Sequence, residues 1–112
     1  MKKFLVLYRS SMSAGELMAG STPEQMQAGM DAWTAWAKQA GDAIVDLGSP
    51  VGDGQRVGAA SSTAGDAQIS GFSILQADSK DAVATLLKEH PHLQTPGESS
   101  IEILELLEVP GM

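Results

Sequence analysis

The sequence predicts one α+β domain with an antiparallel sheet, and the order of its elements is the main reason. Segments with strand-like apolar alternation and segments with a helical apolar period follow one another as strand, helix, strand, strand, helix, strand. This βαββαβ order is typical of a ferredoxin-like sheet. The length of 112 residues fits a single domain over residues 1–112.

The first strand is expected over residues 2–9 (KKFLVLYR). Apolar side chains alternate on both of its faces, so both faces should be covered. They are Phe4, Val6 and Tyr8 on one face and Leu5 and Leu7 on the other. Residues 10–21 lack a clear period and are expected to form a loop.

The first helix has clear start and stop signals. Thr22 and Gln25 match a capping box, Pro23 suits the first helical turn, and Gly41 suits a C-terminal stop. The expected core stripe of this helix, with Trp36 beside it, consists of Met26, Met30, Trp33, Ala37 and Ala40.

A second strand is expected over residues 43–47, and the Gly-Ser-Pro sequence at 48–50 ends or bends it. Asp53 and Gly54 form a tight-turn signal. Residues 55–61 are therefore expected to fold back as a hairpin arm.

The next strand is expected over residues 68–76, where Gly71 marks a close backbone approach or a bulge. The second helix is expected to begin near Asp78 or Ser79, which are good capping residues. Pro91 disfavours helix at the residue before it and should close the helix.

The last strand is expected over residues 101–109 (IEILELLEV). Two helices can cover only one face of a four-stranded sheet, and the other face still carries apolar side chains. An exposed apolar patch of that size normally marks an interface. The pattern therefore predicts a homodimer whose two sheets pack face to face, about 10 Å apart.

Composition excludes several classes of function. The net charge is −7 and the seven Lys and Arg are scattered, so no basic stripe exists and nucleic-acid binding is not expected. The chain has no cysteine, which excludes disulfides, zinc–thiolate sites and thiol catalysis. The apolar run after Met1 is too short for an export signal, and no segment is long enough to span a membrane, so a cytoplasmic protein is expected.

His90 and His92 flank Pro91 at the end of the second helix. As metal ligands they would need a third ligand, and none is obvious nearby, so no metal and no cofactor are expected. The simpler interpretation is that His90 caps the helix end and His92 is solvated.

A catalytic role for His90 is the competing interpretation. A neighbouring carboxylate would fix its tautomer and raise its pKa, which would suit a general acid or base. Asp31 and Asp46 are the candidates. Asp31 lies beside the apolar stripe of the first helix, which places it either at the solvent boundary or toward a cleft.

Other residues could line a pocket. Trp33 with the neighbouring methionines is either core or dimer contact, or the wall of a pocket for an apolar or aromatic compound. Tyr8 would line the same pocket. Arg9, at the end of the first strand, could bind a small anion or an exposed carboxylate.

Several segments resemble the YCII-related proteins, and most closely their DGPF-domain branch. They are the opening strand ending in Tyr8, residues 30–37 (MDAWTAWA), 44–50 (IVDLGSP), 70–75 (SGFSIL) and 80–91 (KDAVATLLKEHP). The resemblance implies a dimeric α+β barrel built on a ferredoxin-like fold. It also implies an enzymatic role for part of the family, through a His on the first helix and an Asp before the Pro that follows the second. At least one relative acts on a chlorinated hydroxyquinone.

The chain departs from this family pattern at the residues that would matter. Asp31 falls near the position of the helix His and His90 falls at the position of the Asp, so the pair would be exchanged. The DGPF tetrapeptide is missing, and only the acidic Asp66 remains in its region.

The leading hypothesis is therefore an enzyme-like homodimer that acts on a small aromatic or quinone-like molecule. His90 would be the general acid or base, Asp31 its orienting carboxylate, and Tyr8, Trp33 and Arg9 would bind the substrate. The alternatives are a non-catalytic small-molecule binding or regulatory module, in which His90 is only a helix cap, and a purely structural partner domain.

Overall fold

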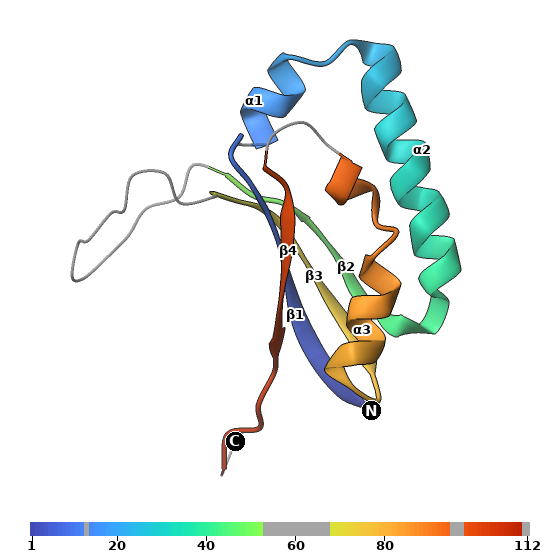
Figure 1. Cartoon of the computed structure of the whole chain (residues 1–112), viewed down its shortest axis with the longest axis vertical. Coiled ribbons are helices and arrows are strands. Elements are labelled where there is room, and N and C mark those ends of the chain that lie inside the picture. Colours follow the sequence, from blue (N-terminus) through green and yellow to red (C-terminus); the bar gives the residue numbers. More distant parts are fainter. Residues whose placement is uncertain (13, 53–67, 95–97, 111–112) are drawn as a thin grey trace, which may run out of the picture.

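A computed structural model describes residues 1–12, 14–52, 68–94 and 98–110 of the chain. It confirms the predicted α+β class, with an antiparallel sheet of four strands in the order β2-β3-β1-β4 (Figure 1). The elements are β1 (Lys2–Ser10), α1 (Ala14–Ala19), α2 (Pro23–Ala40), β2 (Ile44–Pro50), β3 (Gln68–Ala77), α3 (Lys80–Leu87) and β4 (Ser100–Glu105). Short 3₁₀ turns follow α2 at Gly41–Ala43 and α3 at Pro91–Gln94.

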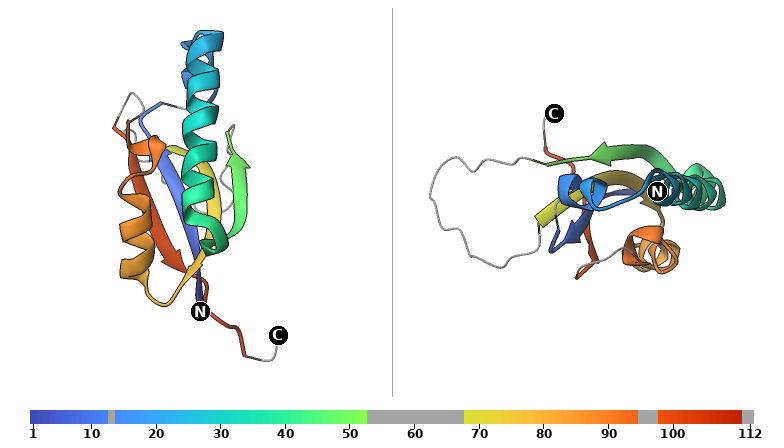
Figure 2. Two further views of the ribbon diagram at one scale, coloured as in Figure 1. Left: turned by 90° about the vertical axis from the view of Figure 1, so that its right-hand side faces the viewer. Right: turned by 90° about the horizontal axis from the view of Figure 1, so that it is seen from above.

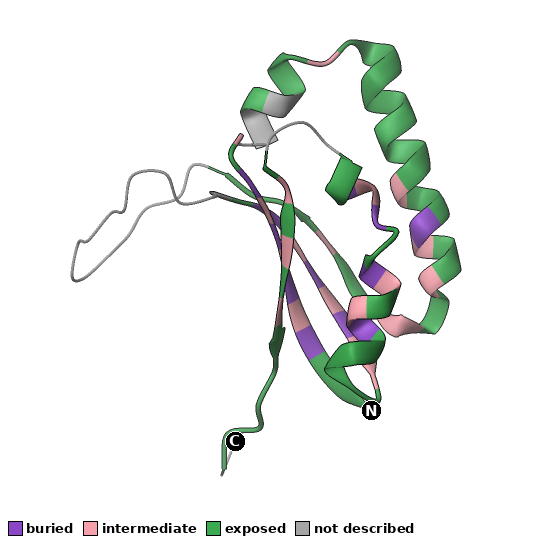
Figure 3. Cartoon of the chain, in the orientation of Figure 1, coloured by how far each residue is buried: buried purple, intermediate pink, exposed green. Residues whose placement is uncertain are grey.

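The two longer helices lie on the same side of the sheet (Figure 2). β1 is central and pairs antiparallel with both β3 and β4. The apolar core forms between the sheet and the helices, where the buried residues gather in Figure 3. Its buried members are Phe4, Val6, Tyr8, Trp36, Leu75, Val83 and Leu87.

The opposite face of the sheet is covered by no described element. Leu5 lies opposite Ile74 and Leu104, and Leu7 lies opposite Phe72, so these side chains share one face. Four of them are half-buried and Leu104 is exposed. Within the described part of a single chain, the predicted cover for this second face is therefore missing. We call this set of residues (Leu5, Leu7, Phe72, Ile74 and Leu104) the open face.

The predicted helix signals are confirmed. The Thr22 hydroxyl oxygen accepts a hydrogen bond from the Gln25 backbone amide at 3.1 Å. The Gln25 side-chain oxygen accepts one from the Thr22 backbone amide at 2.9 Å. Gly41 ends α2 with a positive φ of 53°, and Ser79 caps α3. These local rules place both helices within a few residues of the expected positions.

Three predicted boundaries are wrong. Residues 10–21 are not all loop, because Ala14–Ala19 forms the short helix α1, which is too short to show an apolar period. β2 begins at Ile44 and runs on to Pro50, past residue 47, and the register shift between Asp46 and Ser49 agrees with the alternative that the Gly-Ser-Pro sequence bends the strand. β4 ends at Glu105 instead of residue 109. Beyond it the Leu106 amide makes one further bond, to the Lys3 carbonyl of β1, and the chain then leaves the sheet.

The predicted core stripe of α2 is wrong in its N-terminal half. Met26 and Met30 are 45% and 65% exposed, because this part of the helix extends past the sheet. Trp36, which was placed beside the stripe, is the most deeply buried residue of α2. The predicted hairpin arm at 55–61 lies outside the described residues. No helix in the described part of the chain could span a membrane.

Close backbone contacts explain two glycines of the sheet. A Cβ at Gly71 would lie 3.3 Å from the backbone oxygen of Ser49, which confirms the predicted close backbone approach. The register of β1 and β3 also shifts just past the Tyr8–Gly71 pair, so the predicted bulge is present too. Gly48 has a φ of 82°, and a Cβ there would collide with the carbonyl of Phe72 on the neighbouring strand. The pairing of β2 with β3 therefore requires glycine at position 48.

We expect Gly48→Ala to lower the free energy of unfolding by at least about 2 kcal/mol, since it adds both backbone strain and a steric clash. The matched control is Gly29→Ala, in an exposed part of α2 with no atom within 4 Å of the new Cβ. That substitution should stabilise the chain by about 0.5–1 kcal/mol. Urea unfolding of both variants measures the difference, and equal effects would contradict this role for Gly48.

Candidate functional site

A cluster of aromatic rings surrounds His90 between the sheet and α2. The His90 side chain is fully buried. Its ring stacks on Tyr8 with centroids 4.7 Å apart, and it meets Trp33 and Trp36 edge to face at 4.4 Å each. The His92 ring also lies near Tyr8, with centroids 5.3 Å apart. We call these five residues the His90 cluster.

Each member of the cluster is placed by its own element. The alternation of β1 turns Tyr8 toward the helices together with the other buried side chains of that strand. Trp33 and Trp36 lie three residues apart and therefore on the same side of α2. Pro91 stops the helix geometry, and the following 3₁₀ turn carries His92 inward.

The hydrogen bonds of His90 fix its tautomer. Its Nδ1 lies 2.9 Å from the backbone N–H of His92 and must accept from it. A neutral imidazole with an accepting Nδ1 carries its proton on Nε2. His90 is therefore a neutral ring whose Nε2–H is its only donor.

The donor of His90 is unpartnered. Nε2 is buried and has no hydrogen-bond partner among the described residues. Burial lowers the pKa of His90 to about 4, and the nearby His92 acts in the same direction. An unpaired buried donor is unusual in folded proteins and calls for a specific explanation.

His92 holds the turn against the sheet. Its Nε2 lies 2.8 Å from the carbonyl oxygen of Arg9, which can only accept, so Nε2 donates. The prediction that His92 is solvated is wrong, because only 4% of it is exposed. The backbone of the same residue orients His90, so His92 positions the central ring of the cluster.

A second hydrogen-bonded chain runs from Tyr8 into the sheet. The Ser73 hydroxyl donates to the carbonyl of Leu47 at 2.6 Å, so its oxygen accepts from the Tyr8 hydroxyl at 2.8 Å. Burial raises the pKa of Tyr8 to about 12, and the bond to Ser73 only partly offsets this. Tyr8 is therefore a protonated, fixed wall of the cluster.

The predicted site residues separate into two groups. Tyr8, Trp33 and His90 come together in the cluster. Asp31 is exposed on α2, where its carboxylate accepts from the Gln27 side chain at 2.9 Å. The Arg9 guanidinium donates to the carboxylate of Glu102 at 3.2 Å, which agrees with the simpler interpretation of that residue.

Neither predicted carboxylate orients His90 within one chain. Neither nitrogen of the His90 ring bonds to Asp31. Nδ1 accepts from the His92 N–H, and Nε2 has no partner among the described residues. Asp46 accepts from the Gly48 amide at 2.9 Å and serves the turn in β2. No group of three metal-ligating His, Cys, Asp or Glu side chains occurs in the described part of the chain.

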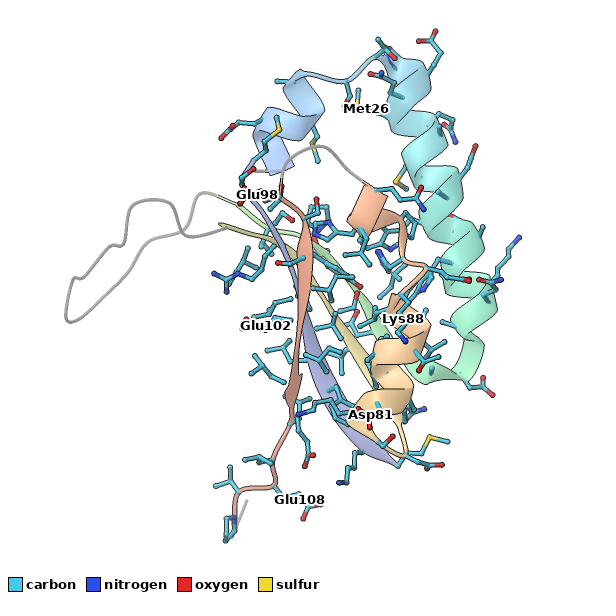
Figure 4. All side chains as sticks on the ribbon, in the orientation of Figure 1. Met26, Asp81, Lys88, Glu98, Glu102 and Glu108 are labelled. Atoms are coloured by element: carbon cyan, nitrogen blue, oxygen red, sulfur yellow. The ribbon has the colours of Figure 1, made fainter. Side chains whose placement is uncertain are left out.

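Trp33 is the most exposed ring of the His90 cluster. It is the half-buried member of the cluster and packs on both Tyr8 and His90. Met30 and Met26 lie one and two helical turns before it on the same side and stay exposed. Figure 4 shows Met26 where α2 approaches α1. An apolar surface therefore continues outward from Trp33.

Comparisons with known proteins add a structural likeness. No family model and no curated protein matches the chain. The chain is similar to the structure of 5-chloro-2-hydroxyhydroquinone dehydrochlorinase from Burkholderia phenoliruptrix AC1100, a complex with 2,5-dihydroxybenzoquinone. The TM-score is 0.48 at 21% identity, over 89% of this chain and 90% of that one. A likeness at this level does not assign an activity.

We expect the stability of the chain to fall as the pH drops from 6.5 to 4. The pKa of His90 is about 4 in the folded chain and 6.5 as the ordinary value, so the unfolded chain binds more protons in this window. The loss attributable to His90 should approach about 3 kcal/mol at pH 4.

The comparison with His90→Phe isolates this effect from the titration of carboxylates. The variant keeps an aromatic ring and has no group to protonate, so its free energy of unfolding should fall less over the same window. Urea unfolding at half-unit pH steps measures both profiles. Parallel profiles would show that His90 does not titrate as its burial requires.

Proposed function

We propose that the chain is a homodimeric small-molecule binding domain that takes a planar aromatic or quinone-like ligand beside Trp33. The carrying observation is the buried, unpartnered Nε2–H of His90. It is a donor whose direction is already fixed, and it therefore suits an acceptor oxygen of a ligand, such as a quinone carbonyl or a phenolate.

The surroundings of this donor favour a flat apolar ligand. Tyr8 and the two tryptophans offer ring faces and edges, and aromatic groups pack well on such surfaces. Met26 and Met30 extend the apolar surface toward solvent, and methionine adapts to varied ligand shapes. Movement of Trp33, the half-buried ring, would open the way from this surface to His90.

The neutral state of His90 shapes the chemistry of the proposed site. Proton uptake at Nδ1 would break its bond with the His92 amide, so His90 is suited to donate a hydrogen bond and not to act as a base at neutral pH. A neutral imidazole donor can still polarise a bound carbonyl. The predicted acid–base pair of His90 and Asp31 stays a prediction, and the experiment below separates it from the binding proposal.

The dimeric ferredoxin-like barrel belongs to the same proposal. The strand order β2-β3-β1-β4 places β1 and β3 at the centre, as two interleaved βαβ units would. The open face supplies an apolar surface that a second sheet could cover. These observations support face-to-face packing of two copies.

We expect 2,5-dihydroxybenzoquinone, a planar ring with carbonyl oxygens, to bind the wild-type chain and His90→Phe to bind it about tenfold more weakly. The loss of one hydrogen bond to a polar ligand accounts for that factor. Isothermal titration calorimetry measures both dissociation constants.

Asp31→Asn is the matched control for this titration, because its side chain lies outside the cluster. Unchanged affinity in Asp31→Asn is the expected result. An equal loss in both variants would instead support the predicted pair. Wild-type affinity in His90→Phe, or no binding by the wild type of this quinone or of simple phenols, would refute the binding proposal.

We expect the wild-type chain to sediment as a dimer and Leu104→Glu to shift it toward monomer. Leu104 is exposed on the open face, so a carboxylate there costs the single chain little but would be buried unpaired between two sheets. The control is Met30→Glu, which changes an exposed apolar residue on α2. Sedimentation equilibrium decides the outcome, and a monomeric wild type would contradict the dimer.

A further inference from the structure

The chain continues past the sheet after β4, and this segment carries exposed apolar side chains. Residues 106–110 (LLEVP), here called the C-terminal arm, leave the sheet at the end where β1 begins (Figure 1). Leu107 is 77% exposed and Val109 is 57% exposed. The last bond from the arm to β1 joins the Leu106 amide to the Lys3 carbonyl at 2.9 Å.

The arm keeps a strand-like sequence, but it leaves its own sheet after the bond from the Leu106 amide to Lys3. The apolar-rich sequence that predicts a strand to residue 109 continues through the arm, but β4 ends at Glu105. An extended apolar segment beyond the last paired residue is a ready template for contact with another chain. The residues that are predicted as strand but lie beyond the end of β4 are therefore candidates for contact with another chain.

A groove of about 490 Å³ lies between the arm and the start of β1. Lys2 and Lys3 contribute to one side of this groove, and Glu105, Leu107 and Glu108 contribute to the other. Lys2 and Glu105 already pair across it at 3.7 Å. Lys3 and Glu108 make no ion pair among the described residues, and Figure 4 places Glu108 on the arm.

The charges left over in this groove match each other. A twofold axis makes every contact reciprocal, so a basic residue of one copy that meets an acidic residue of the other does so twice. Lys3 and Glu108 meet this requirement. A different protein that offered charges of only one sign here would leave either Lys3 or Glu108 without an opposite charge. The groove also adjoins the open face. Lys3 lies two residues before Leu5 on β1 and therefore on the same face, and Leu106, two residues after Leu104, bonds to Lys3.

We propose that the C-terminal arm docks in the corresponding groove of a second copy of this chain, with reciprocal Lys3–Glu108 ion pairs and Leu107 as the apolar contact. This inference rests on the homodimer of the proposed function and adds which ends of the two sheets meet. The like ends lie together, so the twofold axis runs along the strands.

Charge exchange tests the pairing in the full-length chain. We expect Lys3→Glu and Glu108→Lys each to raise the dimer dissociation constant on the order of tenfold, because each turns two attractions into repulsions. The double exchange Lys3→Glu with Glu108→Lys should restore the dissociation constant to within about threefold of wild type. Lys38→Glu and Glu24→Lys are the controls, since they change net charge equally at exposed positions of α2.

Sedimentation equilibrium at 50 and 300 mM salt separates the outcomes. Rescue in the double variant, with a larger effect of the single changes at low salt, supports the arm contact. A dimer that Leu104→Glu disrupts and the charge exchanges do not affect would overturn the arm contact and leave the sheet-face dimer standing. A monomer at every concentration would overturn both and leave the groove to a different partner.

Discussion

The stacked contact between the rings of Tyr8 and His90 is the constraint on which the rest of the described structure depends. Tyr8 belongs to the central strand, and His90 belongs to the segment that follows α3. Both tryptophans of α2 then pack on His90 instead of on the sheet alone. One ring therefore connects the sheet and both long helices, and the position of α2 over the sheet follows from it.

The same contact decides the chemistry of the site. A charged imidazole would need a counter-charge or water among these rings. The groups that bond to the His90 and Tyr8 rings are the His92 amide and the Ser73 hydroxyl, and neither carries a negative charge. The His92 amide instead selects one neutral tautomer. The backbone thus performs the orienting role that was predicted for a carboxylate, and it leaves a single donor for a ligand to use.

Local signals allowed the helix limits and Gly71 to be predicted from the sequence. The capping box at Thr22 and the stop at Gly41 depend only on neighbouring residues, which is why they could be identified in advance. The rings that meet at His90 come from three separate segments, and their meeting depends on the phase of α2 over the sheet. No spacing in the sequence specifies that phase, so Tyr8, Trp33 and His90 could be named while Asp31 was assigned a contact that the single chain does not make. His92 was misjudged because the 3₁₀ turn at Pro91–Gln94 buries its side chain as well as that of His90.

The placement of both tryptophans has an optical consequence. The chain contains two tryptophans, and each has its ring centroid 4.4 Å from that of His90. A protonated imidazole in contact with an indole quenches its fluorescence, whereas a neutral one does so weakly. All of the intrinsic tryptophan emission of the protein therefore reports on one histidine, and the charge of His90 can be followed in solution without attaching any label.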